Sequence, residues 1–148
     1  MRYDGQAKTL KNKALDDLVI QNRVFAFCPE IAGGLPTPRN AAEIQQGDGA
    51  EVIDKLTKVV TINGDDITEN FLRGARQALE VCQQHRILVA ILTESSPSCG
   101  SNQIYDGSFS RTIRYGVGVT TAMLQRHGID VFNQYQIEAA ISKLKDSY

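Results

Sequence analysis

The stretch ILVAILTESSPSCGS, residues 87–101, decides how the rest of the sequence is interpreted. Its first part, residues 87–92, is an unbroken apolar run of strand length, which is typical of a parallel strand covered on both faces. Its second part, residues 94–101, is a polar turn of serine, proline and glycine. The pattern therefore predicts a central strand that ends in a functional loop around Cys99.

The segments on either side of this stretch predict alternating helices and strands. The clearest helical pattern precedes it, where Asp66 is a candidate cap and apolar residues recur at helical spacing up to Cys82. Because strands that alternate with helices form right-handed crossovers, we expect a three-layer α/β fold, a mostly parallel sheet with helices on both faces. No linker divides residues 1–148, so one domain is expected. The predicted elements are helix 7–20, strand 24–28, short helix 40–46, strand 58–62, helix 66–85, strand 87–92, helix 119–127, strand 129–132 and helix 134–145.

The composition argues against polymeric and membrane partners. The 148 residues include 16 Lys and Arg against 17 Asp and Glu, a formal charge of -1, so no basic surface is expected for a nucleic-acid polymer. The sequence has no run of about 18 apolar residues and no signal-peptide pattern. We therefore expect a cytoplasmic protein without membrane contact, and the sequence predicts no particular oligomeric state.

The three cysteines fall into two groups. Cys28 ends the run VFAFC ahead of a loop rich in glycine and proline, and Cys99 lies in the loop after the central strand. Because loops at the carboxyl ends of parallel strands converge, both thiols are expected at one cavity. Backbone and hydroxyl donors in such loops stabilise thiolates or cluster sulfides, although a lone thiol also often serves only as a small apolar side chain. Cys82 belongs to the apolar face of helix 66–85 and is expected in the core.

Five motifs follow one another along the chain, and each combines residues that are rarely found together. In this order they resemble the thiouracil desulfidase family, long known as a domain of unknown function, and the similarity spans nearly the whole chain. The motifs are RYDG at 2–5, CPEIAGGLPTPR at 28–39, ILTESSPSCGS at 91–101, IYDGSFS at 104–110 and GVGVT at 116–120.

The resemblance implies a small α/β enzyme that binds a [4Fe-4S] cluster through three cysteines and leaves one iron open to a thiolated pyrimidine. On this basis Cys28 and Cys99 are expected as cluster ligands, and Glu30 and Ser96 as residues that act on the substrate. The implied reaction is a non-redox hydrolysis of the C–S bond in which sulfur is accepted on the open iron. Glu30 would take a proton from the attacking water, and Ser96 would hydrogen-bond the ring nitrogen or the developing oxyanion. The expected partner is a small thiolated base or nucleoside.

The sequence departs from the family pattern at its start. Relatives place an apolar strand that ends in a first cysteine ahead of the RYDG motif, whereas here Met1 directly precedes Arg2. The third cluster ligand and the first strand are therefore expected N-terminal of Met1, in an upstream extension. The alternative is an N-terminally truncated homologue that holds no normal cluster.

Two other functions are compatible with these residues. A metal-free enzyme would use Cys99 as a nucleophile with Glu30 as its base, because His85 and His127 each end a predicted helix away from that loop. A non-catalytic module would bind a small molecule or phosphate through the glycine-rich loops. In each case Arg39 has three candidate roles, which are to neutralise a cluster, to orient an acidic substrate or to form a surface ion pair.

Overall fold

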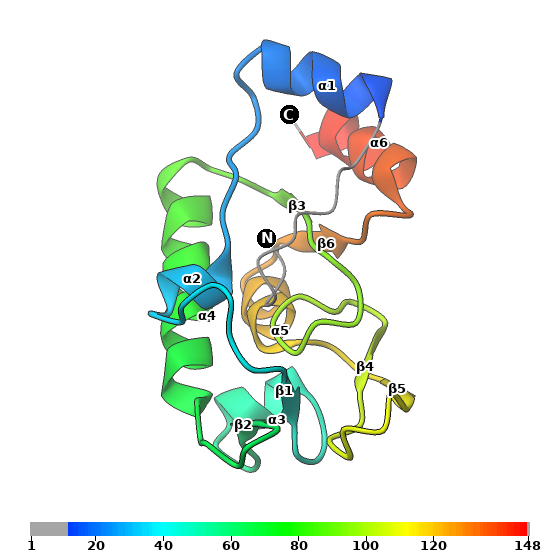
Figure 1. Ribbon diagram of the computed structural model, residues 1–148. Helices are drawn as coiled ribbons and strands as arrows, with labels where there is room; N and C mark the ends of the chain where they lie inside the picture. The colour runs from blue at the N-terminus through cyan, green and yellow to red at the C-terminus, as the bar shows by residue number, and fades with distance from the viewer. Residues whose placement is uncertain (1–11, 148) are drawn as a thin grey trace.

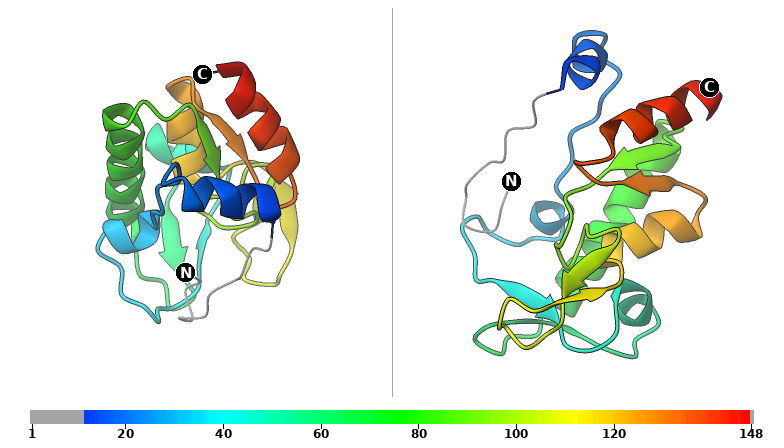
Figure 2. Two further views of the ribbon diagram at one scale, coloured as in Figure 1. Left: turned by 90° about the horizontal axis from the view of Figure 1, so that it is seen from above. Right: turned by 90° about the vertical axis from the view of Figure 1, so that its right-hand side faces the viewer.

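The computed structural model describes residues 12–147, in which helices and short strands alternate (Figure 1). Strand β3 (Val89–Ile91) pairs in parallel with β6 (Asp130–Phe132), with Val89 opposite Asp130 and Ile91 opposite Phe132. Helix α4 (Thr68–Gln84) lies on one side of this pair and α6 (Ile137–Ser147) on the other, where α6 packs against both strands (Figures 1 and 2). The predicted α/β class is therefore confirmed.

Two helices, α4 (Thr68–Gln84) and α5 (Val119–Arg126), pack against each other and carry most of the hydrophobic core. The Asp66 carboxylate accepts from the Thr68 amide at 3.0 Å and so satisfies one unpaired donor of the first turn of α4. Helix α5 is also covered by α3 (Gly49–Ile53), a helix that the sequence did not predict. The buried face of α4 consists of Phe71, Leu72, Gly74, Ala75, Ala78, Leu79 and Cys82.

The described chain begins with a helix and an extended connection. Helix α1 (Lys13–Ile20) lies within the predicted helix 7–20, of which residues 7–11 fall outside the described range. The predicted strand 24–28 is wrong, because within residues 12–147 this segment joins no strand and leaves Val24 and Phe25 exposed. Cys28 is instead the N-cap residue of α2 (Pro29–Ala32). This helix begins at Pro29, because the fixed φ of proline suits the first position of a helix.

The predicted short helix 40–46 is also wrong. Residues Ala42–Ile44 form strand β1, which pairs antiparallel with β2 (Val59–Thr61). The Glu43 carboxylate, on the opposite face of this strand from buried Ile44, accepts from the Gly107 amide at 3.0 Å. These contacts with distant parts of the chain override the local helical preference of the segment.

The described strands pair as three two-stranded sheets, and they are less parallel than the sequence indicates. Strands β4 (Gln103–Tyr105) and β5 (Ile113–Tyr115) form an antiparallel hairpin through the connection 106–112. A parallel pair needs a crossover of about a dozen or more residues, which this connection cannot supply. Because β1 and β2 are antiparallel too, the prediction of a mostly parallel sheet is wrong for the described strands. Strand β3 is half-buried rather than covered on both faces.

Candidate active site

Cys28 is held at the start of α2, which rests on α4 through two glycines. A Cβ on Gly74 would lie 1.9 Å from the carbonyl oxygen of Pro29, and one on Gly33 would lie 2.0 Å from the carbonyl oxygen of Asn70. Only glycine allows backbones to approach so closely. The Asn70 side chain then donates to the Gly33 carbonyl at 2.8 Å, which fixes α2, and Cys28 with it, on α4.

Cys99 is held by the N-terminal end of α5. The amide of Thr120 donates to the Ser98 carbonyl at 2.8 Å, and the hydroxyls of the same two residues are 2.8 Å apart and share a hydrogen bond. The Thr121 hydroxyl donates to the Cys99 carbonyl at 2.9 Å. The first amides of a helix have no partner within the helix, so the loop of Cys99 caps α5 while α5 fixes the loop.

Glycines also bring the backbones of the Cys99 loop, α5 and α3 together. A Cβ on Gly118 would lie 2.3 Å from the Ser98 carbonyl carbon and 2.6 Å from the Cys99 amide nitrogen. A Cβ on Gly49, at the start of α3, would lie 2.2 Å from the Gly118 carbonyl carbon. Because α4 and α5 pack on each other, one pair of helices holds both cysteine loops.

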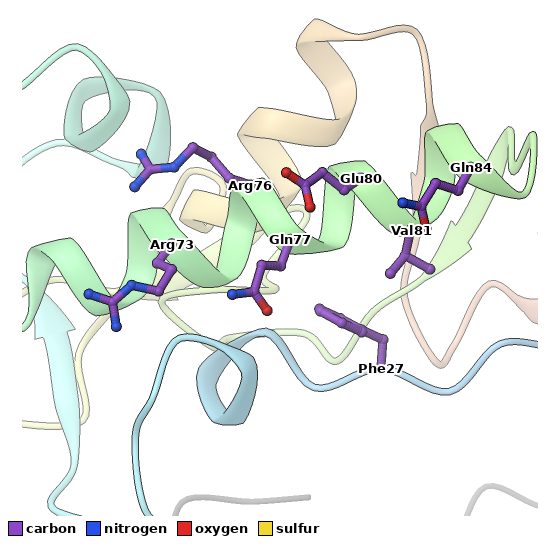
Figure 3. Close-up of a pocket in the computed structure, with 7 residues that line it drawn as sticks. All are labelled: Phe27, Arg73, Arg76, Gln77, Glu80, Val81 and Gln84. Atoms are coloured by element: carbon purple, nitrogen blue, oxygen red, sulfur yellow. The ribbon is translucent and has the colours of Figure 1, made fainter.

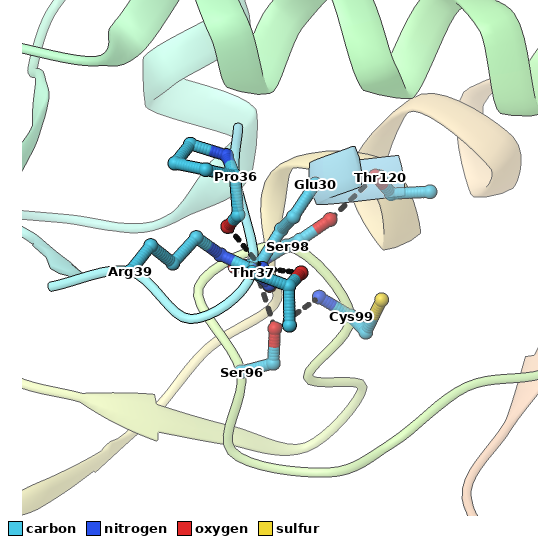
Figure 4. A network of polar contacts seen from close by, with 8 residues as sticks. All are labelled: Glu30, Pro36, Thr37, Arg39, Ser96, Ser98, Cys99 and Thr120. Atoms are coloured by element: carbon cyan, nitrogen blue, oxygen red, sulfur yellow. Dashed lines mark hydrogen bonds and ion pairs between the residues drawn. The ribbon is translucent and has the colours of Figure 1, made fainter. Parts of the chain in front are cut away.

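The two loops bring the four residues predicted for the site together, and Figure 4 shows three of them, Glu30, Ser96 and Cys99. Burial raises the pKa of the Cys99 thiol to about 12; hydrogen bonds with the Ser98 and Ser96 hydroxyls oppose this rise, and the charges of Glu30 and Cys28 add to it. Such charge effects require short separations. The two thiols, 71 positions apart in the sequence, therefore lie close enough for the charge of one to act on the other.

The Ser96 hydroxyl is oriented by two backbone donors. Its oxygen accepts from the amide of Ser98 at 3.0 Å and from the amide of Cys99 at 3.2 Å. A hydroxyl accepts two hydrogen bonds and donates one, so its proton is the part left to donate. The turn around Ser96 thus presents a hydroxyl donor beside the Cys99 thiol.

The Glu30 carboxylate forms an ion pair with Arg39, in the same network (Figure 4). The Arg39 side chain is only 6% exposed and that of Glu30 17%. The ion pair of Arg39 is therefore largely buried, and not the surface pair that was one of its candidate roles. Arg39 also donates to the Pro36 carbonyl and to the Thr37 hydroxyl, each at 3.0 Å. The motif LPTPR therefore orients Glu30, a role that spacing in the sequence did not reveal.

Comparison with known proteins identifies the family. Residues 1–136 match the profile described as 2-thiouracil desulfurase. The chain belongs to this family. It is similar to the [4Fe-4S]-dependent thiouracil desulfidase TudS, with 48% identity and a TM-score of 0.88 over 97% of this chain and 88% of that structure. It is also 38% identical to the uncharacterized protein YbbK of Bacillus subtilis (strain 168) over 136 residues, which cover 92% of this chain and 89% of that protein.

The remaining cysteine and the histidines of this 2-thiouracil desulfurase family member lie away from the site. Cys82 is buried on the core face of α4, as predicted, and burial raises its pKa. His85 ends α4 and stacks on Phe25 with ring centroids 4.1 Å apart. The Nδ1 atom of His127 lies 2.8 Å from the Met123 carbonyl at the opposite end of α5 from Cys99. The metal-free nucleophile hypothesis thus gains no histidine base.

Two shallow grooves border the site of this desulfurase family member. One, of about 380 Å³, runs along α4 beside Phe27 and two arginines, Arg73 and Arg76 (Figure 3). The other, of about 490 Å³, is lined by Arg39 together with prolines of the LPTPR segment. The second groove therefore reaches the ion pair of Glu30, whereas neither groove is lined by the two cysteines.

Cys28 and Cys99 are the residues that could hold a metal or cluster. Among residues 12–147, no set of three His, Cys, Asp or Glu side chains comes together as a metal site, so this part of the chain offers two thiol ligands. Arg2 and the RYDG motif lie outside the described residues. Over the same described range, no helix combines the length and the apolar character that crossing a bilayer requires.

One residue that the sequence analysis assigned only to a polar turn has an unusual environment. Burial raises the pKa of Glu94, but hydrogen bonds from Asn102, Gln103, Asn133 and Ser101 outweigh this effect and lower it to about 2. These partners come from two separate segments, residues 101–103 and Asn133. Only the tertiary structure brings these donors together, so no local sequence pattern could have predicted the environment of Glu94.

Proposed function

We propose that this chain is an iron-sulfur-dependent desulfidase that removes sulfur from a small thiolated pyrimidine, either a free base or a nucleoside. What supports the proposal is that the loop with Cys28 and Glu30 is docked on α4, the loop with Ser96 and Cys99 is docked on α5, and these two helices pack against each other. The similarity to a [4Fe-4S]-dependent thiouracil desulfidase over nearly the whole chain supports it.

The two thiols fit a pair of cluster ligands. Hydroxyl groups of Ser96 and Ser98 lie beside Cys99, and donors of this kind stabilise thiolate ligands. Cys28 is the N-cap of α2, two residues before Glu30, and the charge of Glu30 acts on Cys99, so the carboxylate belongs to the surroundings of both thiols. When bound, the cluster supplies a Lewis-acidic iron that polarises the thiocarbonyl group of the substrate.

The side chains around the thiols supply the proton transfers. Arg39 holds the Glu30 carboxylate in place, so that one of its oxygens accepts a proton from the attacking water. Ser96, whose oxygen accepts from two amides, has one proton, which turns from the Cys99 sulfur to the ring nitrogen or to the oxygen that develops negative charge when substrate binds. The proline-lined groove next to Arg39 gives the substrate room to extend beyond the ring.

The reaction balances without electron transfer. The oxygen of water adds to the thiocarbonyl carbon, the C–S bond breaks, and sulfur leaves as sulfide while water supplies both protons. A thiouracil-like base thereby becomes the corresponding uracil-like base. We assign this reaction to the cytoplasm, because reducing conditions keep the three cysteines as thiols.

Anaerobic reconstitution with iron and sulfide, of the chain together with the upstream segment expected to supply the third cysteine, tests the proposal. We expect a brown protein that contains iron and inorganic sulfide and that converts thiouracil to uracil, followed by loss of the thiocarbonyl absorption. Cys28→Ser and Cys99→Ser should each abolish iron retention, because each removes one thiolate ligand.

Cys82→Ser is the matched control, because it makes the same substitution in the core, away from the site. It should retain iron and activity. A wild-type protein that stays colourless and iron-free after reconstitution would contradict the proposed function. Equal loss of iron in all three serine variants would contradict the assignment of the ligands.

A further inference from the structure

The carboxylate of Glu94, at the end of β3, accepts hydrogen bonds from the far end of the loop that it begins. Its Oε1 atom accepts from the amides of Ser101, Asn102 and Gln103 at 2.9, 3.0 and 3.1 Å. The amide of Ser95 adds a fourth, longer contact at 3.3 Å. One oxygen atom therefore joins the first residues of the loop to its last ones.

The second carboxylate oxygen connects the loop to β6. Oε2 accepts from the side-chain amide of Asn133 at 2.8 Å, from the Ser101 hydroxyl at 3.2 Å and from Asn102 Nδ2 at 3.3 Å. The amide of Glu94 itself donates to Gln134 Oε1 at 2.9 Å. Asn133 is buried and follows β6 directly, so the parallel strand pair provides a fixed base for the loop.

We propose that Glu94 is a positioning residue of the site, because its carboxylate closes the loop 94–103 and thereby fixes where Ser96 and Cys99 lie. Helix α5 holds the middle of this loop through Ser98 and Cys99, and Glu94 holds its two ends. The inference deepens the proposed function and rests on it for the roles of Ser96 and Cys99.

A carboxylate is required because every group that hydrogen-bonds to the two carboxylate oxygens of Glu94 is a donor. The hydrogen bonds to its two oxygens come from backbone amides, side-chain amides and one hydroxyl. Glutamine has the same shape, but it replaces one acceptor oxygen with an NH₂ group. That group would point at donors, so Glu94→Gln should release the ends of the loop while preserving its volume.

Hydrogen–deuterium exchange on the full chain, with and without reconstituted iron, tests the inference. In Glu94→Gln we expect the amides of residues 95–103 to exchange at least about 10-fold faster, while α6 stays as protected as in the wild type. In the reconstituted protein, release of iron to a chelator should accelerate by about 10- to 100-fold, the usual effect of disturbing the residues behind a metal ligand. The kcat for thiouracil should fall more than KM rises, because misplaced Ser96 and Cys99 affect the transition state most.

Asp106→Asn provides the matched control, since Asp106 is a carboxylate in the neighbouring turn that accepts from the Ser108 amide at 2.9 Å. It should leave exchange in 95–103 unchanged. If Glu94→Gln proves too unstable, Ser101→Ala removes one donor and should give a smaller increase in the same peptide.

The outcomes separate this inference from the proposed function. Unchanged exchange of 95–103 in Glu94→Gln, or an equal rise throughout the molecule, would overturn the positioning role whether or not a cluster forms. Faster exchange confined to the loop in a protein that cannot be reconstituted would support the role of Glu94 in holding the loop and count against the desulfidase proposal alone.

Discussion

Gly118→Ala adds one methyl group at the point where the Cys99 loop crosses the start of α5. The φ of Gly118 is -73°, which alanine adopts without strain, so the effect of the substitution comes from contact alone. The new Cβ would lie 2.3 Å from the Ser98 carbonyl carbon and 2.4 Å from its oxygen. These are backbone atoms, which cannot rotate away as a side chain would.

The expected cost follows from this contact. Overpacking usually destabilises a protein by about 1–3 kcal/mol, and a rigid backbone obstacle places Gly118→Ala at the upper end, at about 3 kcal/mol. Gly128→Ala, at the other end of α5, is the control: its Cβ would meet no atom within 4 Å, but its φ is +79°. Alanine in that region costs about 1–2 kcal/mol through the backbone alone.

Urea denaturation of both variants measures the difference. The midpoint of Gly118→Ala should fall further than that of Gly128→Ala, with an unchanged m-value, and its melting temperature should drop by roughly 6–12 °C. Only Gly118→Ala should also change the alkylation rate of Cys99, read by peptide mapping of the iron-free chain. A Gly118→Ala protein as stable as the wild type, with Cys99 unaffected, would refute the close docking of this loop on α5.

Three further results are expected. Arg39→Met leaves the Glu30 carboxylate unpaired and mostly buried, so it should lower the free energy of unfolding by about 3 kcal/mol in a denaturant titration. Adding Glu30→Gln to this variant should recover part of the lost free energy. A loss below about 1 kcal/mol in Arg39→Met would argue against a buried ion pair. The pKa of Glu94 is lowered from 4.5 to about 2, so its carboxylate contributes stability, on the order of 3 kcal/mol, that is present above pH 4.5 and lost as the pH falls towards 2. Glu94→Gln should lack this part of the pH dependence, and an equally steep acid loss in variant and wild type would contradict it. Cys82→Ala should cost about 1 kcal/mol, seen as a lower urea midpoint, without changing the iron content; loss of iron would instead make Cys82 a ligand.

Elements with a strong local pattern were predictable from the sequence. The spacing of apolar residues predicted α4, and the apolar run at 87–92 predicted β3 with the Cys99 loop directly after it. Helix α5 was predicted between Gly118 and Gly128, which bound it. The run VFAFC led to the wrong prediction of a strand at 24–28, because a short apolar segment has the same composition whether or not a neighbouring strand is there to pair with it. The strand Ala42–Ile44 was missed for the converse reason, since its partner β2 and the donors to Glu43 lie far along the chain.

The sequence indicated which residues form the candidate site, but not which residues hold them in place. Glycine, proline and serine around Cys28 and Cys99 indicated two special loops, and the family motifs assigned Glu30 and Ser96 to them. The roles of these four residues stay predictions. The supports, Glu94 and Arg39, could not be inferred, because a charged side chain in a polar loop has the same sequence signature whether it is solvated or closes a loop.

The arrangement of α4 and α5 has a consequence for how the site can respond to mutation. Each helix carries one half of it, so the separation between the two sulfur atoms is a property of the interhelical packing rather than of either loop. A peptide that reproduces one motif therefore lacks the site altogether. Core substitutions on α4, such as a larger side chain at Ala75 or Ala78, would shift the halves relative to each other and so alter the affinity for an inorganic group held by both.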